Sequence, residues 1–195
     1  MVRLLLTRND VNPNWPDSQD RTPLWWASFN GHEGVVSLLL ALNEVNPNNP
    51  DKLGETPLRQ ALSRGHMGIV RLLLERDDIN PDEPDSDGKT PLWSASSNGQ
   101  EVVVGLLLAQ DGVNPNKPDN DGRGPLWGAS SNGREGVVSL LLARHDINPD
   151  KPDNEGKTPL WGAAWDGHKR VVELLLARGD VNPDKPDKDG KTPLW

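Results

Sequence analysis

This 195-residue chain contains acidic loop sequences whose residue types and spacing could bind a calcium ion. The stretches PDSDGKT and PDNDGRG both contain Asp-x-Asp-Gly, an order that also occurs in calcium-binding loops. An EF-hand loop needs a carboxylate at its first and twelfth positions. With Gly122 at the sixth position those places hold Lys117 and Gly128, and with Gly88 there the twelfth is Ser94. The pattern therefore predicts Asx-Gly turns at loop tips and no metal site.

Histidine is the second residue type here that could bind a metal ion. His32, His66 and His168 each follow a glycine, at intervals of 34 residues or a multiple of 34. In a repeated structure this spacing puts the three side chains in separate units, too far apart to share one ion. We expect each of them to form a hydrogen bond in its loop. The fourth histidine, His145, stands alone in a loop.

The chain contains no recognisable catalytic motif. The sequences G-x-S-x-G, the phosphate-binding P-loop and H-E-x-x-H are all absent. There is no cysteine to act as a nucleophile, and the carboxylates recur in polar loops instead of forming a buried pair with separated pKa values. The sequence therefore predicts a non-enzymatic protein without a cofactor.

Charge and composition restrict the classes of partner. The net charge is -8 and the isoelectric point is near 5.0, whereas nucleic acid and anionic membrane surfaces attract basic proteins. No apolar stretch approaches the roughly 20 residues of a membrane-spanning helix, and the first residues do not resemble a signal peptide. We expect a cytoplasmic protein whose partner is neither nucleic acid nor membrane.

A repeat of 34 residues organises the chain. Pro-Leu recurs at this spacing from Pro23 to Pro193. The units that begin at Thr90 and Gly124 agree at 22 of 34 positions, which is typical of a repeat architecture and not of one compact domain. The predicted units are a partial repeat at 1–21, five complete repeats at 22–55, 56–89, 90–123, 124–157 and 158–191, and the start of a further repeat at 192–195.

Each unit contains signals for two short helices and a long loop. In the last complete unit, Thr158 is an expected N-cap, Pro159 occupies the first helical position, and Gly167 follows the short helix PLWGAAWD. The stretch KRVVELLLAR predicts a second helix with a broad apolar stripe, and DVNPDKPDKDGK predicts an extended, hairpin-like loop. Because neither helix can bury its apolar face alone, we expect the units to stack.

This pattern resembles the ankyrin repeat. The residues that carry the resemblance are GETPLRQALSRGHMGIVRLLLERDDIN, residues 54–80, and their copies along the chain. The period is 34 residues where ankyrin repeats have 33, and Trp stands where the family has His after Pro-Leu. In these two features the chain is similar to the ankyrin arrays of fungal NOD-like, NACHT-type receptors. The resemblance implies an all-α repeat solenoid that binds a protein or peptide through a concave face, as a scaffold or a receptor's sensor array.

Tryptophan recurs directly after Pro-Leu, and this recurrence favours a structural role. The position is occupied by Trp25, Arg59, Trp93, Trp127, Trp161 and Trp195. A residue repeated in every unit serves the unit, so we expect each indole to pack between adjacent first helices with its N–H bonded nearby. Arg59 interrupts the column, and we expect it to act as a cation–π partner of its tryptophan neighbours.

Positions that vary between units are the better candidates for partner contacts. They lie on the exposed side of the first helices and at the loop tips, where Trp and Arg are typical interface anchors. The candidate partner-binding residues are Trp26, Phe29, Asn30, Leu53, Arg64, Asn98, Asn132, Trp165 and Asp166.

Two alternatives remain open from the sequence. Mostly Ser-Asn pairs occupy the supposed binding face, which would also suit a structural spacer rod without a ligand. The chain opens within a second-helix sequence, MVRLLL, and closes within a first-helix sequence, TPLW, so neither end has the polar face of a capping repeat. We therefore also expect end-to-end self-association through apolar termini.

Overall fold

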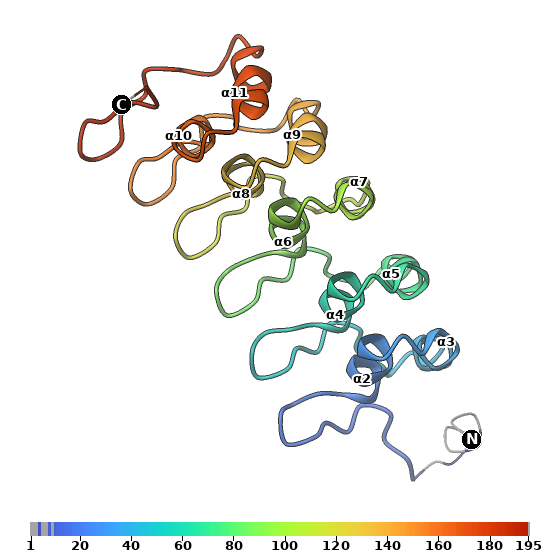
Figure 1. Cartoon of the computed structure of the whole chain (residues 1–195). Helices are drawn as coiled ribbons and strands as arrows, with labels where there is room; N and C mark the ends of the chain where they lie inside the picture. The colour runs from blue at the N-terminus through green and yellow to red at the C-terminus, as the bar shows by residue number, and fades with distance from the viewer. Residues whose placement is uncertain (1–3, 5–7, 9, 195) are drawn as a thin grey trace. The chain divides into compact units, whose positions relative to one another are not determined.

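Paired helices recur along the chain at a spacing of 34 residues (Figure 1). The computed structural model describes residues 4, 8 and 10–194, and no strand is present among them. Two compact units divide the chain, one ending at Ser86 and the other beginning at Asp87. The predicted all-α fold of repeated helix pairs is therefore confirmed, whereas the expectations for MVRLLL and Trp195 fall largely or wholly outside the described residues.

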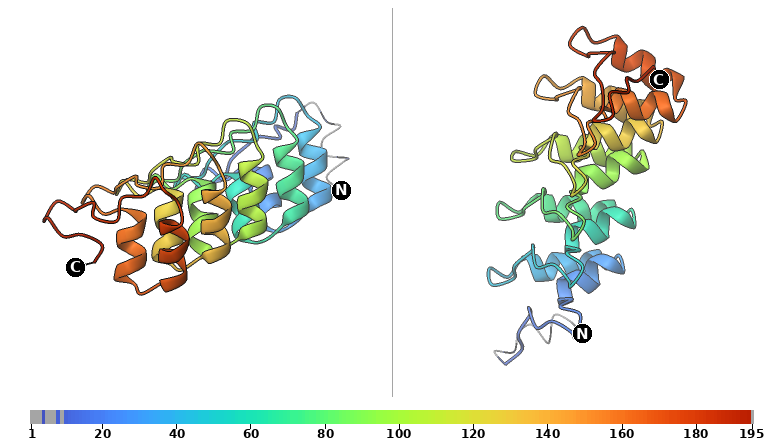
Figure 2. Two further views of the ribbon diagram at one scale, coloured as in Figure 1. Left: turned by 90° about the horizontal axis from the view of Figure 1, so that it is seen from above. Right: turned by 90° about the vertical axis from the view of Figure 1, so that its left-hand side faces the viewer.

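Each unit has the same layered order of helices and loops. The first unit contains α2 (Pro23–Phe29), α3 (Glu33–Leu40), α4 (Pro57–Ser63) and α5 (Met67–Leu74). The second contains α6 (Pro91–Asn98), α7 (Glu101–Leu108), α8 (Pro125–Ser131), α9 (Glu135–Leu142), α10 (Pro159–Trp165) and α11 (Lys169–Leu176). Within each unit, first helices contact first helices, second helices contact second helices, and the loops project together from one side (Figure 2).

The first helices begin as the sequence predicts. The hydroxyls of Thr22, Thr56, Thr90 and Thr158 each accept a hydrogen bond from the N–H three residues later, and a proline follows each threonine. Gly124, the threonine's counterpart before α8, provides no side-chain cap. Gly167 follows α10 in the left-handed region, at φ 75°, and Asp20 occupies that region at φ 63° in place of a glycine.

The core consists of aliphatic side chains from both helices of each pair. Leu24 and Val36 of the first unit, and Leu92 and Leu107 of the second, are almost completely inaccessible to solvent. A buried leucine or valine contributes about 1.5–3 kcal/mol relative to an exposed one. Because each helix has at most eight residues, this burial depends on neighbouring pairs within the unit.

The recurring Asn-Pro-Asn sequences join the loops of adjacent repeats. Asn48 Nδ2 donates to the carbonyl of Asp78 at 2.7 Å, and Asn48 Oδ1 accepts from the N–H of Asn80 at 2.7 Å. Asn116 makes the corresponding two bonds in the second unit. The asparagine amide therefore satisfies main-chain groups of the following repeat that would otherwise need water.

The loop tips are the predicted Asx-Gly turns. Asp119 Oδ1 accepts from the N–H groups of Asp121 and Arg123 at 3.0 and 2.8 Å, so this carboxylate closes the turn. The next tip then bonds to this one, because the N–H of Asn154 donates to the carbonyl of Asp121 at 2.8 Å. Extended tips in register thus bond through their main chains without forming a strand in the described residues.

An Arg-x-Asp sequence after several second helices ties each repeat to the one before. The Arg144 guanidinium donates two hydrogen bonds to the Asp146 carboxylate, both at 2.8 Å, and a third to the carbonyl of Leu108 at 3.0 Å. Arg76 and Arg178 repeat this arrangement. Hydrogen bonding from Arg144 lowers the pKa of Asp146 below its usual value.

Candidate recognition surface

The tryptophans after Pro-Leu pack against the next first helix, as expected. The Trp93 indole lies beside Gly128 of α8, where an added Cβ would be 3.7 Å from the ring. Trp127 lies in the same way beside Gly162 of α10. Only Trp25 is buried, with 4% of its surface exposed, and the other described indoles of the column are half-buried.

A basic side chain lies over each described indole of this column. The Arg123 guanidinium carbon is 4.5 Å from the Trp127 ring centroid, and Lys157 Nζ is 4.6 Å from that of Trp161. The same relation joins Lys89 to Trp93 and Arg21 to Trp25. In each pair the cation stands four residues before the tryptophan, where an exposed cation–π contact contributes about 0.5–1 kcal/mol.

The indole N–H groups do not all find the partner that the sequence led us to expect. Trp25 Nε1 donates to the carbonyl of Glu55 and Trp93 Nε1 to that of Arg123, both at 2.9 Å and both in the following loop. Trp127 Nε1 is buried without a hydrogen-bond partner among the described residues. The expectation therefore holds for two indoles and fails for Trp127.

Arg59 forms ion pairs that the sequence did not predict. Its guanidinium forms ion pairs with Glu55, at 3.0 Å, and with Asp85, and its side chain is 9% exposed. Glu55 stands four residues before Arg59. At the equivalent position the other repeats have a basic residue, four residues before a tryptophan. The cation–indole pair of the other repeats is thus replaced by a carboxylate–guanidinium pair. If a basic residue stood at position 55, as it does at the equivalent position of the other repeats, its positive charge would repel Arg59.

Two non-repeated aromatic residues of the first unit, Trp26 and Phe29, form a cluster with Trp25. Phe29 stacks on Trp25 with ring centroids 5.0 Å apart, and Trp26 contacts both rings edge-on. Arg21 covers Trp26 at 4.4 Å, and Arg64 of the next repeat covers Phe29 at 3.4 Å. Phe29 is therefore half-buried, although we expected it to be exposed, whereas Trp26 keeps 37% of its surface exposed.

Asp17 completes this cluster from the preceding loop. Its carboxylate accepts hydrogen bonds from Arg21 Nε at 2.9 Å and from Trp26 Nε1 at 3.2 Å. The Arg21 guanidinium holds the pKa of the Asp17 carboxyl well below its usual range. The Arg21 guanidinium and the Trp26 indole N–H therefore both have a hydrogen-bond acceptor within the chain.

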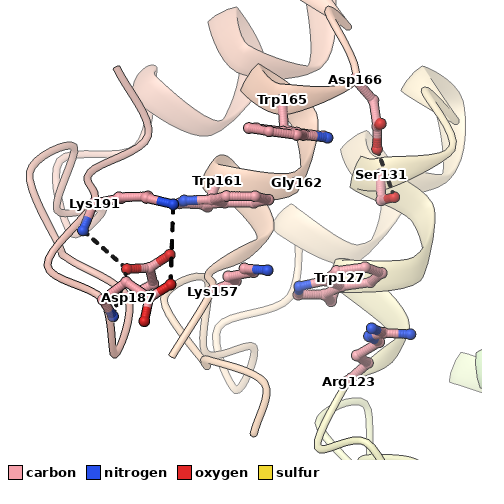
Figure 3. A pocket seen from close by; sticks show the side chains of 11 residues that line it. Arg123, Trp127, Ser131, Lys157, Trp161, Gly162, Trp165, Asp166, Asp187 and Lys191 are labelled. Atoms are coloured by element: carbon pink, nitrogen blue, oxygen red, sulfur yellow. Dashed lines mark hydrogen bonds and ion pairs between the residues drawn. The ribbon is translucent and has the colours of Figure 1, made fainter. Parts of the chain in front are cut away.

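The second unit has a cavity of about 310 Å³ where the column of indoles meets the loops. Figure 3 shows Trp165 lying parallel to Trp161, with Lys157, Trp127 and Arg123 following toward the other end. The rings of Trp161 and Trp165 stack at 5.0 Å and 12°. Trp165 is 69% exposed, so its face opposite Trp161 is open to solvent.

A family comparison agrees with this repeated arrangement. A model described as ankyrin repeats in three copies matches residues 36–119 and 103–187, and a single ankyrin repeat model matches residues 19–52. The chain belongs to the ankyrin-repeat family. A search of curated proteins found no match. Ankyrin repeats typically form protein-interaction scaffolds without catalytic activity.

Some of the other candidate residues of this ankyrin array form hydrogen bonds within the chain, and others are exposed. Asn30 and Asn132 each donate from Nδ2 to the carbonyl four residues earlier, at 2.9 and 2.8 Å, so they cap α2 and α8. Asp166 accepts from the hydroxyl of Ser131 at 2.9 Å, whereas Leu53 is 66% exposed at its loop tip. Asn98, the last residue of α6, is also exposed.

Histidine side chains also link the ankyrin repeats. His66 Nε2 lies 3.3 Å from the carbonyl of Phe29, and His168 Nε2 lies 3.0 Å from that of Ser131, each in the preceding repeat. Each therefore makes the kind of loop hydrogen bond that we expected. Within the described part of the chain, no three His, Asp or Glu side chains come together as a metal site requires.

One exposed aromatic residue was not among the sequence candidates. Trp15 lies in the first loop and is 74% exposed. Asn, Glu and Lys occupy the equivalent positions of later repeats, so the sequence could have indicated Trp15 as a candidate because it does not recur.

Over the residues that the structure places, no helix is long and apolar enough to cross a membrane.

Proposed function

We propose that this chain is a non-enzymatic scaffold that binds another protein or a peptide through the loop side of its first helices. The observation that carries the proposal is the exposure of Trp26 and Trp165, which do not recur between repeats. An exposed tryptophan on a soluble surface is a typical interface anchor. In contrast, the repeated indoles are already packed against glycines and cations of the chain itself.

The remaining candidates divide into anchors and supporting contacts. Phe29 and Arg64 present a stacked pair beside Trp26, and Leu53 presents an apolar side chain at a loop tip. The polar candidates Asn30, Asn98, Asn132 and Asp166 supply hydrogen-bonding groups along the same helices. Such an arrangement of few aromatic anchors among polar neighbours suits a protein or peptide partner.

Selection from a random peptide library displayed on phage tests the proposal. Peptides selected on the intact chain should lose binding to a Trp26→Ser/Trp165→Ser variant. They should keep it on Val102→Ser, which removes a 70% exposed apolar side chain from a second helix, α7. Equal binding to all three proteins, or no enrichment on the intact chain, would contradict recognition through this face.

A spacer function is the second candidate, and specific contacts in the second unit favour it. Asn132 Nδ2 donates to Ser97 Oγ at 3.2 Å, and Ser131 donates to Asp166, so these polar side chains link neighbouring repeats. Side chains used in this way have less capacity for a ligand. If no peptide is selected while the chain unfolds cooperatively, the spacer is the better account.

The sequence resemblance supports a finer proposal, that the array is the sensor of a fungal NACHT-type immune receptor in the cytoplasm. It rests on the 34-residue period and on tryptophan after Pro-Leu. The complete coding sequence tests it. A nucleotide-binding domain on the same polypeptide would support the receptor role, and an unrelated neighbouring domain would exclude it.

End-to-end association of two chains stays a prediction. Leu176 and Leu194 are exposed beside a small apolar cavity of about 220 Å³ near the last described residues. Burying such surfaces against a second copy would be favourable. Sedimentation velocity at increasing protein concentration should show growing complexes, and a constant sedimentation coefficient would rule the association out.

A further inference from the structure

Asparagine followed by glycine occurs three times in the chain, each time where a first helix ends. The pairs are Asn30-Gly31, Asn98-Gly99 and Asn132-Gly133. In this dipeptide the main-chain nitrogen of glycine can attack the side-chain amide of asparagine, because glycine has no side chain to shield it. The attack releases ammonia and forms a ring that water opens to a carboxylate. The three pairs are therefore candidate sites of spontaneous deamidation.

Hydrogen bonds at Asn132 oppose this attack. Its Nδ2 donates to the carbonyl of Gly128 at 2.8 Å and to Ser97 Oγ at 3.2 Å. These bonds hold the amide against the preceding turn of α8, so its carbon reaches the Gly133 nitrogen only after they break. Asn30 makes the first of these bonds in the first unit, to the carbonyl four residues earlier, at 2.9 Å.

The side chain of Asn98 is not restrained in this way. Asn98 is the last residue of α6, a helix of eight residues where α8 has seven, and it is exposed. No hydrogen bond joins its side chain to another residue that the structure describes. The N–H groups of Gly99 and Gly133 both donate to the carbonyl three residues earlier, at 3.2 Å. The two pairs therefore differ in the amide under attack and not in the bonding of the nitrogen.

A guanidinium-bearing side chain also lies against Gly99. A Cβ added at Gly99 would be 2.9 Å from Cδ and 3.4 Å from Nε of Arg134. Arg134 Nε donates to the carbonyl of Ser97 at 3.1 Å, and its guanidinium forms no ion pair with a described carboxylate. At the same place over Gly133 the next repeat has the ring of His168.

The charge of Arg134 favours the reaction at Asn98. Attack requires the Gly99 nitrogen to lose its proton, and a nearby positive charge stabilises the anion that forms. A guanidinium stays charged in alkaline solution, whereas an imidazole there is mostly neutral. The anion at Gly99 therefore has a permanent positive charge beside it, which the anion at Gly133 lacks.

We propose that Asn98 deamidates spontaneously in the folded chain. Hydroxide removes the Gly99 amide proton, the nitrogen bonds to Cγ of Asn98, and the Cγ–Nδ2 bond breaks. Ammonia leaves with a proton taken from water, which regenerates hydroxide. Water then adds to either carbonyl of the ring and gives aspartate or isoaspartate. A candidate contact residue thereby acquires a negative charge, at the position where the last complete repeat has Asp166.

Peptide mapping by mass spectrometry tests this proposal on the full chain kept at pH 8.5. The chain unfolded in guanidinium chloride gives the intrinsic rate of each pair, and serine precedes both Asn98 and Asn132. Unfolded, the two should react at similar rates. Folded, Asn98 should react at least about fivefold faster, because a hydrogen bond that must break contributes about 1 kcal/mol.

Two variants test the effect of the guanidinium. Arg134→His introduces the residue that the next repeat has at this position, and it should slow the reaction at Asn98 about threefold in the folded chain only. Arg170→His, the same change on α11, should leave the rate unaltered. Equal rates at Asn98 and Asn132 in the folded chain would overturn the proposal, and an unaltered rate in Arg134→His would overturn the role assigned to Arg134.

Discussion

The two units contain the same repeat but cover their aromatic residues differently. In the first unit, Arg21, Arg64 and Asp17 occupy the faces and edges of the Trp25–Trp26–Phe29 cluster. In the second, the indole of Trp165 lies on Trp161 with its other face open. The cation over a recurring indole comes from four residues earlier in the chain, whereas the cation over the irregular Phe29 comes from the next repeat.

The largest effect is expected where the first unit replaces an indole by an ion pair. Arg59→Ala leaves Glu55 and Asp85 without their shared, largely buried guanidinium. We expect the free energy of unfolding to fall by about 3 kcal/mol, since removing one partner strands the other charges. Urea unfolding followed by far-ultraviolet circular dichroism measures this loss.

Restoring the pattern of the other repeats provides the control. Arg59→Trp alone should also destabilise the chain, because Glu55 lies where a cation normally covers the indole. Adding Glu55→Lys should recover at least half of that loss. If the double variant is no more stable than Arg59→Trp, then the cation four residues before the tryptophan does not stabilise the column.

A smaller effect is expected where the second unit lacks a helix cap that the first unit has. Thr22 and Thr56 cap α2 and α4, but Gly124 precedes α8 without a side chain to do so. Gly124→Thr should stabilise the chain by about 0.3 kcal/mol, because glycine is itself a tolerated N-cap residue. The backbone there is extended, at φ -82°, and an added Cβ meets only a carbonyl oxygen at 3.8 Å. A lower urea midpoint in this variant would contradict the capping account.

The smallest effect concerns a feature that both units share, the Arg-x-Asp sequence. Its hydrogen bonds lower the pKa of Asp78 and Asp146 in the folded chain. A depressed carboxyl pKa stabilises the folded state above the unfolded value, near 3.9, and the gain disappears as pH falls through the folded pKa. The advantage of the natural chain over Asp146→Asn in thermal melting should therefore shrink below about pH 4. A difference independent of pH between 6 and 2.5 would exclude this linkage.

The sequence predicted the architecture well because its signals are local. Thr-Pro-Leu starts and Asx-Gly turns act within a few residues, so they are readable without a structure. The bonds of Asn48 to Asp78 and Asn80 were not predicted, because they depend on how neighbouring loops are placed in register. The same is true of the cavity at Trp165, whose walls come from three consecutive repeats.

The cations over the indoles could have been read from the sequence. Arg21, Lys89, Arg123 and Lys157 recur four residues before a tryptophan, and Glu55 alone reverses the charge where Arg59 replaces the indole. In contrast, the half-exposed state of Trp93 and the unbonded N–H of Trp127 depend on sub-ångström packing between helices. No sequence pattern records that packing.

The most direct test of the division between repeated and irregular indoles compares Trp165→Ala with Trp93→Ala in urea unfolding. Trp93 packs beside Gly128 and donates to the carbonyl of Arg123, so its removal should cost about 3 kcal/mol. Trp165 loses only one ring contact, so its removal should cost at most about 1 kcal/mol. An equal loss of stability in the two variants would show that Trp165 belongs to the packed framework and would contradict its assignment as a contact residue.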